Sequence, residues 1–233
     1  MRLALLCALA VFTAQAQYVS PKLKKEHREI RNLRILPAGI TLQYDDMKGG
    51  HGLPEESEKL GQSVYAAVAQ ELAARGASVL PKLAVSTDDE RFALTDWQRK
   101  FDTIAVQLYR KPHGLEKGRY TLGDGVAAWP PAADADTLVF IRGSGNLLSN
   151  NKQAFYWLTL RPGLSMFLAR VAFADSRSGE IIALARFGYA RNVTQKSEHA
   201  LRSSIREAFH DLPLPKPFKT PSRTAAPTAP GTR

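Results

Sequence analysis

Two runs of apolar, β-branched and aromatic residues flank a short polar turn in the last third of the chain. The first run covers residues 167–174, the second covers residues 181–187, and the turn between them begins at Asp175 and contains Gly179. Such runs on either side of a polar turn with glycine are typical of a β-hairpin. Asp175 can accept hydrogen bonds from the turn backbone, and Gly179 suits a position that needs a positive φ. We therefore predict a hairpin here and expect the rest of the chain to cover or extend it.

Three segments have apolar residues at helical spacing. The clearest covers residues 54–75, where apolar residues recur at every fourth position, Pro54 fits the first turn and Gly76 ends the helix. The same spacing predicts helices over residues 96–109 and residues 197–209. Each predicted helix carries one apolar stripe, so each should pack on a core.

Three further segments are predicted strands. Residues 32–42 are apolar but are interrupted by Pro37 and Gly39, which favours an edge strand or a bulge. Residues 77–83 predict a short strand, and residues 136–142 predict a central one.

Four segments have no clear period. Residues 44–52 and residues 113–131 are rich in glycine or proline and are predicted surface loops. Residues 143–145, Gly-Ser-Gly, lack the remaining residues of a dinucleotide or phosphate loop, so we expect a tight turn there. Residues 154–160 are apolar at nearly every position and fit either a strand or a hydrophobic flap.

The first 16 residues have the form of a secretory signal peptide. Arg2 precedes an apolar run over residues 3–12, and alanines stand at positions 14 and 16. About ten apolar residues are too few to span a bilayer, which needs roughly 20. We therefore expect cleavage between Ala16 and Gln17, a mature chain without a transmembrane segment, and a periplasmic or secreted location.

The chain has one cysteine, Cys7, and it lies within this predicted signal peptide. Leu5 and Leu6 precede Cys7 with no small residue next to it, and the apolar run continues after it, so a lipoprotein signal is not expected. The mature chain would then hold no disulfide, no thiol nucleophile and no cysteine metal site.

The formal charge of +10 lies mainly at the two ends of the chain. Arg2 contributes one charge, residues 18–35 contribute four and residues 212–233 contribute four, so about one is left for the middle. We expect a basic N-terminal arm over residues 17–32 and a disordered tail, rich in proline, threonine and alanine, over residues 213–233. In an exported protein such arms would make weak contacts with anionic lipid or cell-wall polymer, or simply be solvated, and nucleic acid is not an expected partner.

No motif in the sequence carries a recognisable catalytic chemistry. The histidines are not spaced as metal ligands, and the chain lacks the nucleophile elbow of serine hydrolases. Acidic residues cluster at Asp45 with Asp46 and at residues 88–90. Neither cluster resembles a calcium-binding loop, so a solvated turn or a helix start explains them better than a cation site does. We expect no catalytic residue, no cofactor and no metal. The alternative is a periplasmic hydrolase that uses Asp45, Asp46 and His51.

The largest aromatic cluster of the chain covers residues 155–157 and follows a polar loop at residues 150–153. Aromatic clusters are usually buried, but they are also enriched in protein interfaces. We keep both interpretations. The candidate partner surface combines this cluster with basic residues of the N-terminal arm: Phe155, Tyr156, Trp157, Lys22, Lys24 and Lys25.

The order of the predicted elements resembles that of the α/β domain of bacterial envelope proteins related to the curli-secretion lipoprotein and to the amino-terminal domain of the Tol translocation protein. In those domains the last hairpin has an apolar strand, Asp, a few residues, Thr or Ser, Gly, Glu and a second apolar strand. Asp175, Ser178, Gly179 and Glu180 match this pattern. The resemblance covers residues 33–212 and implies an α+β (mixed α/β) domain. Its single sheet would have about five strands, with helices packed mainly on one face and a closing helix after the hairpin.

The resemblance also implies a non-enzymatic role in envelope assembly. The chain departs from those proteins because it lacks a lipidated cysteine and a long membrane-crossing insertion, so a pore is not expected. We expect an exported periplasmic binding or scaffolding domain with an envelope protein as its partner. The alternatives are the hydrolase described above and a cationic binder of envelope polyanions.

Overall fold

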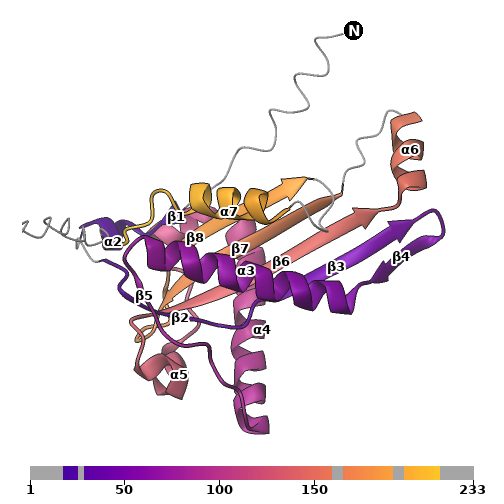
Figure 1. The fold of residues 1–233 in the computed structure, drawn as a ribbon. Coiled ribbons are helices and arrows are strands. Elements are labelled where there is room, and N and C mark those ends of the chain that lie inside the picture. The colour runs from indigo at the N-terminus through magenta and orange to yellow at the C-terminus, as the bar shows by residue number, and fades with distance from the viewer. Residues whose placement is uncertain (1–17, 26–28, 159–164, 191–196, 216–233) are drawn as a thin grey trace, which may run out of the picture.

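Strands β7 (Met166–Asp175) and β8 (Ile181–Ala190) form the predicted hairpin within a mixed sheet. The structure is a computed structural model and describes residues 18–25, 29–158, 165–190 and 197–215. In Figure 1 the hairpin runs along the sheet beside the long strand β6 (Thr137–Leu148), which is antiparallel to β7. The hairpin prediction is therefore confirmed.

The other edge of β6 pairs with two successive strands, β2 (Asn32–Ile35) and β3 (Gly39–Asp46), both parallel to it. Ile35 lies opposite Val139 and Gly39 lies opposite Arg142, so this edge carries one residue more than β6 between the two pairings. The single strand predicted over residues 32–42 is therefore two strands, and the extra residue lies in the break around Pro37 between them.

Three short strands complete the sheet. β1 (Tyr18–Val19) is antiparallel to β8, β5 (Ser78–Val79) is parallel to β2, and β4 (Gly49–Gly52) is antiparallel to β3. The loop predicted over residues 44–52 is therefore wrong, because the chain continues its ladder hydrogen bonds into a hairpin between β3 and β4. The predicted α+β class with one sheet and a closing helix is confirmed, with eight strands among the described residues instead of about five. The helices do not lie mainly on one face as predicted, because helices pack on both faces of the sheet.

One face of the sheet is covered by α3 (Pro54–Ala74) and α7 (Ser197–Ala208), both close to their predicted ranges (Figure 1). Their apolar stripes pack on the sheet residues of this face, and Phe209 meets Phe173 edge-on, with ring centroids 5.9 Å apart. Arg75 joins the two helices, since its guanidinium donates to the backbone carbonyls of Arg206 and Phe209, both at 2.7 Å.

The opposite face carries α4 (Asp88–Arg110), two 3₁₀ helices, η2 (Pro112–Lys117) and η3 (Asp124–Ala128), and α5 (Pro130–Ala133). The surface loop predicted over residues 113–131 is wrong. Each short turn contributes a side chain to a second core, and the buried ones are Leu115, Tyr120, Leu122, Val126 and Trp129. Their spacing is irregular, so no periodic pattern marks them in the sequence.

The tight turn predicted at residues 143–145 is also wrong, because β6 continues through both glycines. A Cβ on Gly143 would lie 2.8 Å from Cδ1 of Ile40, and a Cβ on Gly145 would lie 2.6 Å from Cδ2 of Leu42. The glycines therefore let the side chains of β3 pack close against β6, which is a role of glycine within a strand.

The N-terminal segment packs on the domain as far as it is described. Beside β1, the short helix α2 (Pro21–Lys25) follows, and Leu23 and Ile30 are buried in the same core as α3. The predicted cleavage between Ala16 and Gln17, and the tail from residue 216, lie outside the described residues. Within the described ranges, no helix combines the length and the apolar character needed to cross a membrane.

Helix α4 begins at Asp88, eight residues before the predicted start at residue 96. Thr87 and Glu90 form a capping box: the Thr87 hydroxyl accepts from the backbone N–H of Glu90, and the Glu90 carboxylate accepts from the backbone N–H of Thr87. The acidic cluster at residues 88–90 is thus a helix start, one of the two readings that the sequence left open.

We expect the Glu90→Ala variant to lose thermal stability at neutral pH but not in acid. Hydrogen bonds from the backbone N–H groups of Thr87 and Ser86 hold the pKa of Glu90 below its ordinary value. A carboxyl whose folded pKa is depressed stabilises the fold above its unfolded pKa, about 4.3, and this contribution disappears as pH falls through the folded value. The gap in Tm between wild type and variant should therefore narrow from pH 7 to pH 3. A gap that stays constant with pH would contradict the cap.

Candidate functional site

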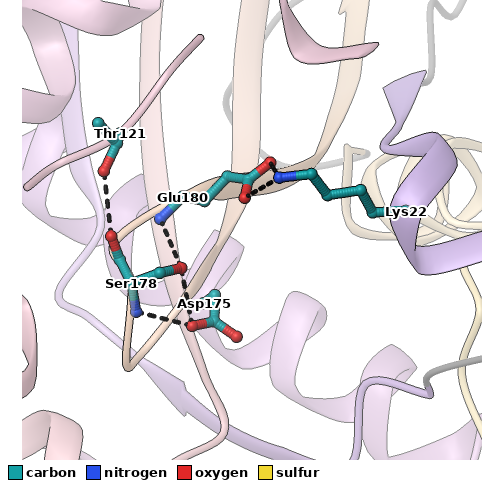
Figure 2. A network of polar contacts seen from close by, with 5 residues as sticks. All are labelled: Lys22, Thr121, Asp175, Ser178 and Glu180. Atoms are coloured by element: carbon teal, nitrogen blue, oxygen red, sulfur yellow. Dashed lines mark hydrogen bonds and ion pairs between the residues drawn. The ribbon is translucent and has the colours of Figure 1, made fainter. Parts of the chain in front are cut away.

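The turn between β7 and β8 is organised by the side chain of Asp175, which is buried. Its Oδ1 accepts from the backbone N–H of Arg177 at 3.0 Å, the backbone N–H of Ser178 at 2.8 Å and the Ser178 hydroxyl at 3.0 Å. Gly179 follows with φ of 68°, the conformation that glycine adopts most easily. Figure 2 shows the two hydrogen bonds between Ser178 and Asp175. Both roles inferred from the sequence for Asp175 and Gly179 are confirmed.

The turn also holds two segments that are distant in the sequence. The hydroxyl of Thr121 donates to the carbonyl of Ser178 at 3.1 Å, and Leu122 N–H donates to the carbonyl of Gly179 at 2.9 Å. On the other side, the Lys22 ammonium of α2 donates to both oxygens of Glu180, at 2.9 and 3.1 Å (Figure 2). The turn therefore clamps the loop after η2 and the N-terminal helix onto the sheet.

A cavity of about 510 Å³ opens beside this turn, between α2 and the start of β6. Its charged lining consists of four carboxylates and two cations: Glu29, Asp136, Asp175, Glu180, Lys22 and Arg177. The carboxylates are engaged in the fold, since Glu29 pairs with Arg31 at 3.2 Å and Asp136 accepts from the backbone N–H of Asn32 at 3.4 Å. The cavity is a structural junction, and no group of three or more histidines or carboxylates in the described part of the chain could hold a metal ion.

The predicted aromatic segment lies at the opposite end of the sheet, in helix α6 (Asn150–Leu158) directly after β6. Of the two interpretations of residues 154–160, the strand is wrong for the described part, because a helix that starts at the polar residues 150–153 continues through it. Phe155 is 45% exposed and Tyr156 is half-buried, with their ring centroids 6.2 Å apart. Leu158, at the end of the same helix, is 84% exposed.

Helix α6 is fixed to its neighbours by polar contacts. The Lys152 ammonium pairs with the carboxylate of Asp45 on β3, and this hydrogen bond raises the pKa of Lys152 above its ordinary value. The Gln153 amide donates to the hydroxyl of Ser165 at 3.2 Å, and the same hydroxyl accepts from the backbone N–H of Leu148 at 3.0 Å. These contacts join α6 to the end of β3 and to the start of β7.

Two methionines lie at this same end of the sheet. Met166, the first residue of β7, is 41% exposed, and Met47, in the turn between β3 and β4, is 58% exposed. We call the four residues Met47, Phe155, Leu158 and Met166 the distal surface. Only Phe155 among them was a candidate from the sequence. Phe155 and Leu158 are three positions apart on a segment that starts with polar residues. This helical spacing is the sequence signal that could have indicated the helix.

The basic residues proposed for the same partner surface lie at the other end of the sheet. Lys22 is paired with Glu180 at the β7–β8 turn, and Lys25 is exposed on α2. Since β7 runs from Met166 to Asp175, it separates these lysines from the distal surface. The candidate residues thus form two regions, while the side chains of Lys24 and Trp157 lie outside the described set.

The three residues of the hydrolase alternative all lie on the β3–β4 hairpin, but the register places Asp45 on the opposite face from Asp46 and His51. Asp45 is engaged by Lys152, and Asp46 accepts from the backbone N–H groups of Lys48 at 2.7 Å and Gly49 at 3.0 Å. The ring of His51 packs against Tyr44 on the paired strand, with centroids 5.3 Å apart. Both carboxylates therefore have structural roles in the hairpin.

No protein-family model and no curated protein matches the chain. Among solved structures, it is similar to a PelC dodecamer from Paraburkholderia phytofirmans, with 12% identity over 87% of this chain and 99% of that chain and a TM-score of 0.44. It is also similar to the lipoprotein GNA1162 from Neisseria meningitidis, with 10% identity over 77% of this chain and 96% of that chain and a TM-score of 0.34. Neither protein carries the name of the curli-secretion or Tol families, so that resemblance stays a prediction.

Proposed function

We propose that the chain is an exported, non-enzymatic binding or scaffolding domain of the bacterial envelope, and that it contacts an envelope protein through the distal surface. The observation that carries this proposal is the exposure of Phe155 and Leu158 on a helix that an ion pair joins to the sheet. The N-terminal signal pattern supports export to the periplasm.

The chemistry of the distal surface suits a protein partner. Large apolar side chains that gather at one end of a domain, with polar residues around them, are characteristic of interaction sites. Aromatic residues and methionine are enriched at the centres of protein interfaces. The ion pair between Lys152 and Asp45 presents α6 in a fixed orientation, so binding would cost little ordering of this helix.

The contacts of Asp45 and Asp46 on the β3–β4 hairpin favour a non-enzymatic domain over the hydrolase alternative. A general base must be able to reach the proton that it removes. Asp46 is oriented instead toward the two backbone N–H groups of its own turn, and Asp45 holds α6 through Lys152. These contacts support a structural use of both carboxylates and a non-enzymatic domain.

We expect the Leu158→Glu and Phe155→Glu variants to lose the partner while they keep the fold. Each places a charge on the distal surface, where a bound apolar partner would leave it desolvated. The measurement is the yield of one discrete protein co-purified after cross-linking in intact cells, with a Tm for each variant. Surface substitutions of this kind usually change stability by no more than about 0.5 kcal/mol.

The matched control is Phe92→Glu, which makes the same change on α4, where Phe92 is 77% exposed. This variant should capture the same protein as wild type. Equal losses for Phe92→Glu and Leu158→Glu would show that contact does not depend on the distal surface. Substrate turnover by the purified chain that is abolished by Asp45→Asn would instead establish the hydrolase.

A further inference from the structure

Three arginines lie opposite one another across the middle of the sheet. Arg142 on β6 is paired in register with Arg170 on β7, and Arg170 is paired with Arg186 on β8. Residues that are opposite in register place their side chains on the same face of a sheet. We call Arg142, Arg170 and Arg186 the arginine row.

The arginine row lies at the edge of the part of the sheet that α4 covers. Two residues before Arg142, Phe140 stacks on Phe101 of α4 with ring centroids 5.0 Å apart, within the second core. Two and four residues beyond Arg142, Ser144 and Asn146 are exposed on the same face. Figure 1 shows β3 and β6 extending past the place where α4 crosses the sheet. The arginine row therefore borders an open, polar half of the sheet.

Arg142 is held in a fixed position. Its Nε donates to Oδ1 of Asp102 at 2.7 Å, and its Nη2 donates to Oδ2 of the same carboxylate. A Cβ added to Gly39 would clash with Nη1 of Arg142, so the guanidinium rests directly on the backbone of β3. Asp102 thus neutralises one arginine of the row and orients it.

A cavity of about 190 Å³ lies at this point, lined by Arg142, Arg170 and Asp102 together with Ser144, Thr41 and Gly39 among others. Two guanidinium groups and one carboxylate thus meet at this cavity, and Arg186 stands next to Arg170 in the row. Cationic side chains gathered on one face of a sheet create a positive local potential, which attracts an anion.

We propose that the arginine row binds an oxyanion, the phosphate or carboxylate group of a ligand, on the open face of the sheet. The guanidinium fork matches the geometry of such groups, and the hydroxyls of Ser144 and Thr41 add donors at the same cavity. The cavity is smaller than the roughly 300–1,000 Å³ of sites that enclose a whole ligand, so it would receive one charged group. This site goes beyond the proposed function and does not depend on the distal surface.

The probe is inorganic phosphate, added to the full chain at constant ionic strength against chloride. A ligand that binds only the folded state shifts the folding equilibrium by the factor 1 + [L]/Kd, so phosphate should raise Tm above the chloride value. In an NMR titration of wild type, the Nε–Hε signals of Arg142, Arg170 and Arg186 should shift together. Vesicles of phosphatidylglycerol, against phosphatidylcholine, distinguish a lipid headgroup from free phosphate.

The test variants are Arg170→Gln and Arg186→Gln, and the matched control is Arg177→Gln in the exposed part of the β7–β8 turn. Each test variant should weaken phosphate binding at least about tenfold, the usual scale for a charge-assisted hydrogen bond, whereas the control should bind as wild type. Arg170→Lys keeps the charge without the fork and should bind with intermediate affinity. Equal Tm values in phosphate and chloride, equal loss in Arg177→Gln, or unshifted arginine signals in wild type would each overturn the proposal.

Discussion

The Phe173→Ala substitution should lower the free energy of unfolding by about 4 kcal/mol, the largest effect that we expect for a single residue. Phe173 is fully buried on β7, opposite Val139 on β6 and Ala183 on β8. Its ring meets that of Phe209, directly after α7, so truncation would open a cavity where the closing helix is seated on the sheet. Urea denaturation measured by circular dichroism gives the change.

Phe92→Ala is the control for this substitution, because it removes the same atoms from a side chain that is 77% exposed. Its effect should lie within about 0.5 kcal/mol of zero. If the two variants were equally stable, the packing of α7 against the hairpin would be contradicted.

The second large effect is expected for Asp175→Ala, which should lower the free energy of unfolding by about 3 kcal/mol. The substitution removes an acceptor that satisfies two backbone N–H groups and one hydroxyl in a buried turn, and each such bond to a charged group contributes about 1.5–3 kcal/mol before the turn relaxes. The loss should also loosen the segments that the turn clamps. Hydrogen exchange should therefore accelerate at the amides of Leu122 and Ile181, which donate to Gly179 and Tyr120.

Asp175→Asn separates geometry from charge in this prediction. It keeps an oxygen in the position of Oδ1, so it should lose clearly less stability than the alanine variant. Ser178→Ala removes only one hydroxyl from the network and should cost about 1 kcal/mol. An alanine variant at Asp175 with wild-type exchange rates at Leu122 would show that the turn does not act as a clamp.

The hairpin and α3 could be predicted because local signals agree with tertiary structure there. Asp175 and Gly179 mark the turn through their own backbone chemistry, and Pro54 and Gly76 limit a helix whose apolar stripe is regular. The interruption at Pro37 was predictable for the same reason, since proline cannot donate to a ladder.

Other features depend on partners that are distant in the sequence. Gly143 and Gly145 suggest a turn, but the requirement comes from the side chains of Ile40 and Leu42, which occupy the space that a Cβ would need. Residues 113–131 lack a period, because the second core takes one side chain from each short turn. In both cases the sequence pattern reflects only neighbouring residues, whereas the packing that decides the structure involves residues distant in the sequence.

The candidate site divides in the same way. The aromatic segment can be identified from its composition. The exposure of its side chains depends on the position of α6 at the end of β6, which is a tertiary feature. Lys22 looked like part of a free basic arm, yet it pairs with Glu180, far along the chain. The arginine row exists only through strand register, which no local signal specifies.

The most direct test of the proposed function is site-specific photo-cross-linking in intact cells, with a photoreactive residue placed in turn at Leu158, Phe155 and Phe92. The account predicts one discrete envelope protein attached at Leu158 and at Phe155, and no such product at Phe92, although Phe92 is nearly as exposed as Leu158. The same product at all three positions, or a product at Phe92 alone, would contradict the distal surface as the place of contact.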